Sequence, residues 1–109
     1  MRKIKGRLSE DRVEGFLKNR GFEVLARNYR KVFGEIDIIA YKDGEVWFVE
    51  VKTHNPTFNP MDKIDHKKLN RMLKVAGCFM EERGISARAR MFLAIVREEK
   101  VDFVEIDAW

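Results

Sequence analysis

The stretch Glu35-Ile-Asp-Ile-Ile-Ala-Tyr-Lys-Asp-Gly-Glu-Val-Trp-Phe-Val-Glu-Val-Lys52 decides the fold of this chain. Both halves have strand composition, and the Asp43-Gly44 pair between them is the strongest short-range signal for a two-residue hairpin turn. We therefore predict two antiparallel strands, residues 35–41 and 45–52. With Asp43-Gly44 as the turn, the predicted pairs are Lys42 with Glu45, Tyr41 with Val46, Ile39 with Phe48, Asp37 with Glu50 and Glu35 with Lys52.

The predicted register places two carboxylates, Asp37 and Glu50, directly opposite each other. Opposed side chains have Cβ atoms about 4.5–5.5 Å apart, and like charges at that spacing destabilise a sheet. A cation removes this penalty, and Mg²⁺ is usually held by one or two carboxylates together with waters and substrate phosphates. Lys52 points to the same face, because strand side chains alternate, and there it can act on a water or on a phosphate charge. The pattern predicts a site for Mg²⁺, with Mn²⁺ as a substitute.

Two structural interpretations of these charges remain open. Glu35 and Lys52 can form a cross-strand salt bridge at the surface, and Asp37 can simply face water. The second face of strand 45–52 is apolar, however, which indicates a strand covered on both faces. Acidic residues at the end of such a strand lie at the rim of a core, where an unpaired charge is costly.

These residues resemble a known nuclease signature. Gly34-Glu-Ile-Asp-Ile-Ile-Ala40, followed by Phe48-Val-Glu-Val-Lys52, is similar to the PD-(D/E)xK motif. Within that superfamily the chain most resembles the YraN-like family of predicted endonucleases, and more distantly the archaeal Holliday-junction resolvases. The resemblance covers nearly the whole chain and includes Ser9-Glu-Asp-Arg-Val-Glu-Gly-Phe-Leu17, Gly21-Phe-Glu-Val-Leu25, Arg27-Asn-Tyr-Arg30, Lys68, Arg71, Ala76 and Val104-Glu-Ile-Asp-Ala-Trp109.

The resemblance implies an α/β, restriction-endonuclease-like fold with a mixed central sheet flanked by helices. It also implies metal-dependent hydrolysis of phosphodiester bonds in DNA, with branched, repair or recombination intermediates among the substrates. Carried over by position, Asp37 and Glu50 would ligate the metal, with the backbone carbonyl of Val51 as a further ligand. Lys52 would serve the attacking water, and Glu10 would complete the acidic cluster.

Two positions depart from the pattern of the family. An aspartate often follows an arginine in the next strand, but here Arg90 is followed by Met91 and Phe92. After Lys52 comes Thr53-His54 in place of the usual basic residue nearby. Both departures leave the predicted metal ligands in place and concern the substrate contacts around them.

Composition is that of one small soluble domain, residues 1–109. The chain is 45% hydrophobic and 37% charged, which suits a compact protein with a charged surface. No apolar stretch approaches the ~20 residues of a membrane span, and no signal peptide is evident, so we expect a cytoplasmic protein. A single cysteine, Cys78, excludes an internal disulfide and is interpreted as a small core residue.

The net charge of +4 favours a polyanionic partner, here DNA. Basic residues cluster at the amino terminus, around the first strand and along the second helix, and each cluster is equally compatible with a solvated surface. A pair of active sites would suit cleavage of two strands, which makes a homodimer a hypothesis. The candidate nucleic-acid contacts are Arg27, Arg30, Lys67, Lys68 and Arg71.

The remaining elements follow from periodicity and from stop signals. Residues 9–20 form a predicted helix that Ser9 caps and Gly21 ends, so Glu10 lies in its first turn, where it can merely complement the helix dipole. A second helix, residues 62–83, ends at Gly84. The other predictions are strands at 22–29, 91–96 and 101–106 and a loop at 55–60, which gives the order α-β-β-β-α-β-β.

Histidines and tryptophans outside the motif receive structural interpretations. His54 and His66 lack partners at zinc-ligand spacing, and although His54 could assist a phosphate, an inert loop residue is the favoured interpretation. Trp47 and Trp109 are interpreted as core or interface residues rather than as platforms for bases.

Two rival functions remain open at the level of sequence. A nucleic-acid-binding module could keep this fold without cleaving, and metal binding would discriminate it from the enzyme. An adaptor that binds protein through charged helices would bind with little dependence on salt, whereas DNA binding weakens steeply as salt rises.

Overall fold

The structure, a computed structural model, describes residues 2–57 and 64–106, with side chains from residue 7 onward. Strands β1 to β5 form one sheet in sequence order, in which β3 and β4 run parallel and the other neighbours antiparallel. This confirms the predicted α/β fold class and element order. The elements are α1 (Arg2–Asn19), β1 (Glu23–Lys31), β2 (Gly34–Lys42), β3 (Glu45–Thr53), α2 (His66–Arg83), β4 (Arg88–Val96) and β5 (Val101–Glu105).

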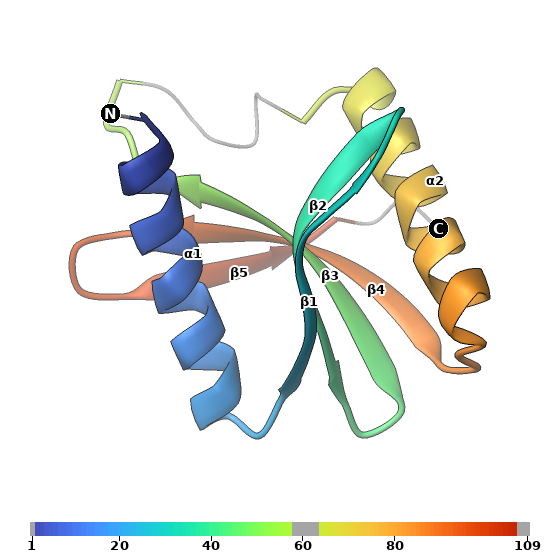
Figure 1. Cartoon of the computed structure of the whole chain (residues 1–109). Coiled ribbons are helices and arrows are strands. Elements are labelled where there is room, and N and C mark those ends of the chain that lie inside the picture. Colours follow the sequence, from blue (N-terminus) through green and yellow to red (C-terminus); the bar gives the residue numbers. More distant parts are fainter. Residues whose placement is uncertain (1, 58–63, 107–109) are drawn as a thin grey trace.

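The two helices cover opposite faces of the twisted sheet (Figure 1). On the α2 face, Phe48 and Met91 pack against Phe79 of the helix. On the α1 face, Val49 and Phe92 belong to the core that Val13 and Leu17 of the helix complete. Strand β3 is therefore covered on both faces, as its continuous apolar sequence predicts. Trp47 lies in the α1-side core and stacks on Phe92 with ring centroids 3.9 Å apart, which confirms its structural interpretation.

The hairpin forms with the predicted turn and register. Asp43 and Gly44 both have positive φ, of 50° and 79°, as a turn that matches the twist of paired strands requires. Residue pairing follows the prediction from Lys42–Glu45 to Ile38–Val49. Beyond that point the backbone ladder stops, and the predicted backbone pair Asp37–Glu50 is replaced by a bond from the Val51 amide to the Asp37 side chain.

The first helix corrects the prediction at its start. It begins at Arg2 rather than at residue 9, so Ser9 is not an N-cap. Ser9 is 6% exposed, and its hydroxyl forms a hydrogen bond of 2.7 Å with Thr53 Oγ1 at the end of β3. Glu10 consequently lies in the middle of the helix, and the interpretation that it complements the dipole of a first turn is wrong. Within the described residues, no helix is long and apolar enough to cross a membrane.

The second helix begins at His66, four residues after the predicted start. Asp65 caps it by accepting a hydrogen bond from the Lys68 amide at 2.8 Å, and Gly84, with φ of 60°, ends it as predicted. Ile64 therefore precedes the helix but still packs against the α2-side core. Residues 62 and 63 of the predicted helix lie outside the described residues, as do Trp109 and residues 58–60 of the predicted loop.

Phe79 packs α2 against the sheet, so its substitution tests the packing between the helix and the sheet. Its side chain is fully buried and contacts the rings of Tyr29 and Phe48 edge-on, at centroid distances of 5.1 and 6.1 Å. We expect Phe79→Ala to lower the free energy of unfolding by about 3–5 kcal/mol, because the cavity adds to the lost transfer energy. Urea unfolding measures the change. Phe33→Ala is the matched control, since Phe33 is 40% exposed, and an equal loss in both variants would contradict this packing.

Candidate active site

Asp37 and Glu50 lie side by side at the point where β2 and β3 separate. Asp37 Oδ2 accepts a hydrogen bond of 2.7 Å from the Val51 amide, which fixes its carboxylate over the end of the ladder. Glu50 is 6% exposed. Burial, and next the negative charge of Glu50, raise the pKa of Asp37 to about 8. The interpretation that Asp37 simply faces water is therefore wrong.

Two lysines neutralise Glu50. Lys68 Nζ, from the first turn of α2, lies 2.7 Å from Glu50 Oε2, and Lys52 Nζ lies 3.5 Å from the same oxygen. Burial lowers the pKa of Lys68, but its bond to Glu50 outweighs this and the net shift is upward. The cluster thus contains two carboxyl groups and two ammonium groups, three of them from the hairpin that the sequence predicts.

The carboxylates open into a cleft of about 210 Å³ between β2 and α2. The close approach of these elements depends on Gly34, because a Cβ there would stand 3.2 Å from Val75 Cγ2 and 3.3 Å from Arg71 Cβ. This contact holds the first turns of α2 against the start of β2. The cleft is lined by Gly34, Glu35, Asp37, Glu50, Lys68, Arg71 and Met72.

Glu10 approaches this cluster but is held by other residues. Its carboxylate accepts bonds from Arg27 Nη2 at 3.0 Å and from Asn28 Nδ2 at 3.2 and 3.3 Å. Its negative charge is a minor contributor to the raised pKa of Asp37. Glu10 is therefore close enough to act through its field, and Arg27 is the residue that positions it.

Arg27 is engaged by the protein rather than free for phosphate. Besides Glu10, its guanidinium pairs with Asp11 at 2.6 Å and with Glu14 at 3.0 Å, and these bonds prevail over burial to raise its pKa. Sequence spacing did not reveal these partners, since they lie on the preceding helix. Among the candidate nucleic-acid contacts, Arg27 thus ties β1 to α1.

The other candidate contacts surround the cleft more openly. Arg30 is 74% exposed and pairs with Glu35 at 3.3 Å, so the surface salt bridge predicted between Glu35 and Lys52 does not form. Lys67 is exposed on α2, and Arg71 lines the cleft directly. Lys68 forms an ion pair with Glu50. Of the five candidate nucleic-acid contacts, it is therefore the one nearest to the carboxylates.

The donor set suits a divalent cation that shares its coordination with water and phosphate. Burial and the neighbouring Glu50 raise the pKa of Asp37, so this pair of carboxyl groups gains by exchanging a proton for a metal ion. No group of three or more His, Cys, Asp or Glu side chains that could enclose a metal is present among the described residues. The residues therefore fit an open site with two protein carboxylates, and they do not fit a closed site built by protein alone.

The pH dependence of stability tests the carboxylate pair. Because the pKa of Asp37 rises from 3.8 to about 8 on folding, the folded protein binds more protons than the unfolded chain between these values. Stability is then highest at low pH and falls as pH rises through this window. We expect a loss of about 2–3 kcal/mol between pH 5.5 and 8.5 in metal-free protein, relative to Asp37→Asn. Parallel stability curves for the two proteins in urea would contradict the pair.

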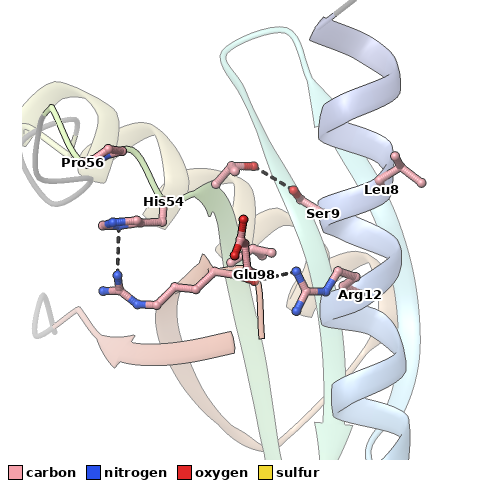
Figure 2. Close-up of a pocket in the computed structure, with 9 residues that line it drawn as sticks. Leu8, Ser9, Arg12, His54, Pro56 and Glu98 are labelled. Carbon is pink, nitrogen blue, oxygen red and sulfur yellow. Dashed lines mark hydrogen bonds between the residues drawn. The ribbon is translucent and has the colours of Figure 1, made fainter. Parts of the chain in front are cut away.

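A larger pocket, of about 560 Å³, lies on the α1 face at the ends of β3 and β4 (Figure 2). His54 lines this pocket, not the cleft, and its Nδ1 lies 2.9 Å from Arg97 Nη1. Sequence analysis missed this pocket, because its lining residues come from three separate segments. The signal available was Thr53-His54, where the sequence departs from the nuclease pattern that it resembles. Cys78, interpreted from the sequence as a core residue, is half-buried and lines a surface hollow beside Phe33.

Comparison with known proteins identifies the family of this chain. The profile described as "Uncharacterised protein family UPF0102" matches residues 9–106. A UPF0102 protein of Campylobacter jejuni is 38% identical over 102 residues, which is 94% of this chain and 91% of that protein. UPF0102 proteins of Thermotoga neapolitana and Helicobacter pylori are each 38% identical, over 91% and 93% of this chain and 92% and 88% of their own lengths. This chain belongs to the UPF0102 family, the family also known as YraN.

Proposed function

We propose that this protein is a metal-dependent endonuclease that hydrolyses phosphodiester bonds in DNA. The observation that carries the proposal is the buried pair Asp37 and Glu50, set in a cleft with cationic side chains of β3 and α2 around it. Burial, and next the negative charge of Glu50, raise the pKa of Asp37 to about 8, and strongly shifted carboxyl groups in a cleft are characteristic of functional sites.

Asp37 and Glu50 hold a Mg²⁺ ion in this proposal, with Mn²⁺ as a substitute. The Val51 amide is directed at Asp37, and since a strand residue directs its amide and carbonyl to the same neighbour, the Val51 carbonyl faces the same side as a third oxygen ligand. Such a cation, when bound, polarises a phosphate oxygen and lowers the pKa of a bound water.

Side chains that line or adjoin the cleft then have the remaining roles. Lys52 leaves Glu50 and, as an ammonium group, positions the attacking water. Lys68 and Arg71 bind the phosphate oxygens, where fixed cations stabilise the charge that develops during hydrolysis. Lys67 and Arg30 extend the cationic surface beyond the cleft and bind the DNA backbone on either side. Glu10 adds negative field to the centre, held in place by Arg27 and Asn28.

A cleavage assay tests the proposal. Linear duplex, single-stranded and branched DNA are incubated with the protein and Mg²⁺ or Mn²⁺, with and without EDTA, at low and high salt. We expect cleavage that requires the metal and weakens steeply with salt, because phosphate contacts release counterions. Absence of cleavage on every substrate with both metals, by protein that still binds DNA, would contradict the enzyme.

One observation favours a second function. Lys68 and Lys52 already neutralise Glu50 without a metal, so the site is electrostatically satisfied as a fixed ion cluster. A nucleic-acid-binding module that does not cleave would need no more than this. It predicts DNA binding unchanged by EDTA and by Asp37→Asn, whereas the enzyme predicts that divalent metal strengthens binding at the cleft.

Cleavage of two DNA strands requires two sites, which makes a homodimer part of this proposal. Light scattering on the purified protein, with and without DNA, measures the assembly. We expect the protein part of the DNA complex to have twice the 12.9 kDa mass of one chain, after the mass of the DNA is subtracted. A protein mass of 12.9 kDa under both conditions would remove the dimer and leave the chemistry of the cleft unaffected.

A further inference from the structure

A pocket of larger volume than the cleft lies on the opposite face of the sheet. It opens at the carboxyl ends of the parallel strands β3 and β4, the edge where open α/β sheets bind their ligands. A hydrogen bond of 2.8 Å from the His54 amide to the Val96 carbonyl joins the two strand ends. At about 560 Å³ the pocket falls within the usual range for small-molecule sites, about 300–1,000 Å³.

The pocket combines apolar walls with polar groups that its own protein leaves available. Leu8, which is 59% exposed, and buried Val96 supply apolar surface. Arg12 donates a bond of 2.6 Å to the Arg97 carbonyl, and among the described side chains it has no carboxylate partner. Glu98 likewise forms no ion pair within the described part of the chain (Figure 2).

His54 adds a donor of defined chemistry. Arg97 cannot accept a hydrogen bond, so the 2.9 Å contact between its Nη1 and His54 Nδ1 requires that Nδ1 accepts. A neutral His54 then carries its proton on Nε2 and can donate it to a ligand. Arg97 itself is held by Asp102, at 2.7 Å from its Nε, which keeps this arrangement in place.

This mixture of groups discriminates between ligand classes. A site for a simple anion would not place the Glu98 carboxylate in its wall, since like charges repel. A site for an apolar chain would not need Arg12 and His54. A nucleotide satisfies all of them, because its base has flat apolar faces and a polar edge, and its phosphate takes the arginine. A carboxylate favours base edges that donate from an amino group, as cytosine does.

The pocket and the proposed active site lie on the two sides of the end of β3. Lys52 lies 3.5 Å from Glu50, whereas the next residue, Thr53, lines the pocket and bonds to Ser9 at 2.7 Å. Neighbouring strand residues point to opposite faces, so the end of β3 separates the two sites by the thickness of one strand. A polynucleotide that crosses this strand end contacts both.

We propose that the pocket binds the base of an unpaired nucleotide, one bearing an exocyclic amino group, next to the phosphodiester bond held in the cleft. The link to the cleft rests on the proposed function. A base can enter such a pocket only outside the helical stack, so the preferred DNA is already unpaired there or loses one base pair on binding. The substrate class is therefore DNA with a single-stranded segment, flap or branch at the cleavage position.

Dinucleotide binding tests the pocket without relying on cleavage. ¹⁵N-labelled protein in EDTA is titrated with d(CpC), with d(TpT) and with inorganic phosphate, and amide shifts are recorded. We expect d(CpC) to shift the amides of Thr53, His54 and Arg97, with affinity about fivefold above that of d(TpT). Shifts confined to the cleft, or equal shifts with inorganic phosphate, would overturn the inference.

Variants of the two available charges sharpen the test. Glu98→Gln should abolish the preference for d(CpC), and Arg12→Gln should weaken both dinucleotides about fivefold. Unchanged binding by both pocket variants would overturn the inference.

The outcome separates this inference from the proposed function. Dinucleotide binding in the pocket of a protein that cleaves no DNA would retain the nucleotide site and reject the nuclease. Metal-dependent cleavage by a protein whose pocket amides never shift would reject the nucleotide site and retain the nuclease.

Discussion

We expect Asp37→Asn to abolish the proposed DNA cleavage and, in the metal-free protein, to raise the free energy of unfolding. The variant removes a carboxylate that binds metal in the proposed mechanism, so we expect a rate loss of about 10³-fold or more. It also removes the repulsion with Glu50 while its amide oxygen still accepts the bond from the Val51 amide. We expect stabilisation of about 1–3 kcal/mol at pH 8. Single-turnover cleavage and urea unfolding measure the two effects.

This prediction is specific because the cleavage rate should fall while the free energy of unfolding rises. A residue that merely supports the fold would lose both together. Asp43→Asn is the control, since it removes the same charge from the turn of the same hairpin, where asparagine suits the positive φ of 50°. Cleavage by Asp37→Asn at the rate of the parent would contradict the proposed role of this residue.

Lys52→Met separates catalysis from metal binding. The Lys52 side chain is 32% exposed and its contact with Glu50 is long, at 3.5 Å, so the fold and the carboxylate pair should survive its loss. We expect kcat to fall by about 10²–10³-fold, the usual cost of removing one positioned donor from the transition state, with metal affinity nearly unchanged. Rapid-quench cleavage and metal titration are the measurements.

Lys18→Met controls for the loss of one lysine, because Lys18 lies 58% exposed on α1 and pairs with Glu14 there. Lys68→Met provides a second comparison. Lys68 makes the shorter bond to Glu50, at 2.7 Å, so its loss should lower stability as well as activity. Cleavage by Lys52→Met as fast as by the parent would assign the water-positioning role elsewhere.

The hairpin and its carboxylates were predictable because their signals are local. Asp43-Gly44 fixes the turn, alternation fixes the faces, and the register then places Asp37 beside Glu50 without further information. The register held from Lys42–Glu45 to Ile38–Val49. What local pattern did not predict was the end of the ladder, where the Asp37 side chain takes the Val51 amide.

Long-range contacts account for the errors. Serine is a common N-cap residue, yet the Ser9 hydroxyl is buried against Thr53, which is 44 residues away in sequence. Arginine is a common phosphate-binding residue, yet Arg27 forms ion pairs with three carboxylates of α1. Each depends on how α1 docks onto the sheet, and that geometry has no signature in the spacing of either residue.

The pocket beyond β3 and β4 illustrates the same limit. Its walls come from the middle of α1, the end of β3 and the end of β4, and they meet because β3 and β4 pair in parallel around α2. Thr53-His54 marked the place as unusual in the sequence. Its partners, Arg12 and Glu98, could be identified only after the strands were assembled.

Calorimetric titration with Mn²⁺ tests the central claim most directly, since it examines the carboxylate pair without assuming a substrate. The parent, Asp37→Asn and Asp43→Asn are titrated alone and with a short DNA that completes the coordination. We predict Mn²⁺ binding in the parent and in Asp43→Asn, strengthened by DNA, and no binding in Asp37→Asn. Absence of binding in the parent, both alone and with DNA, would contradict the metal centre and leave a nucleic-acid-binding module.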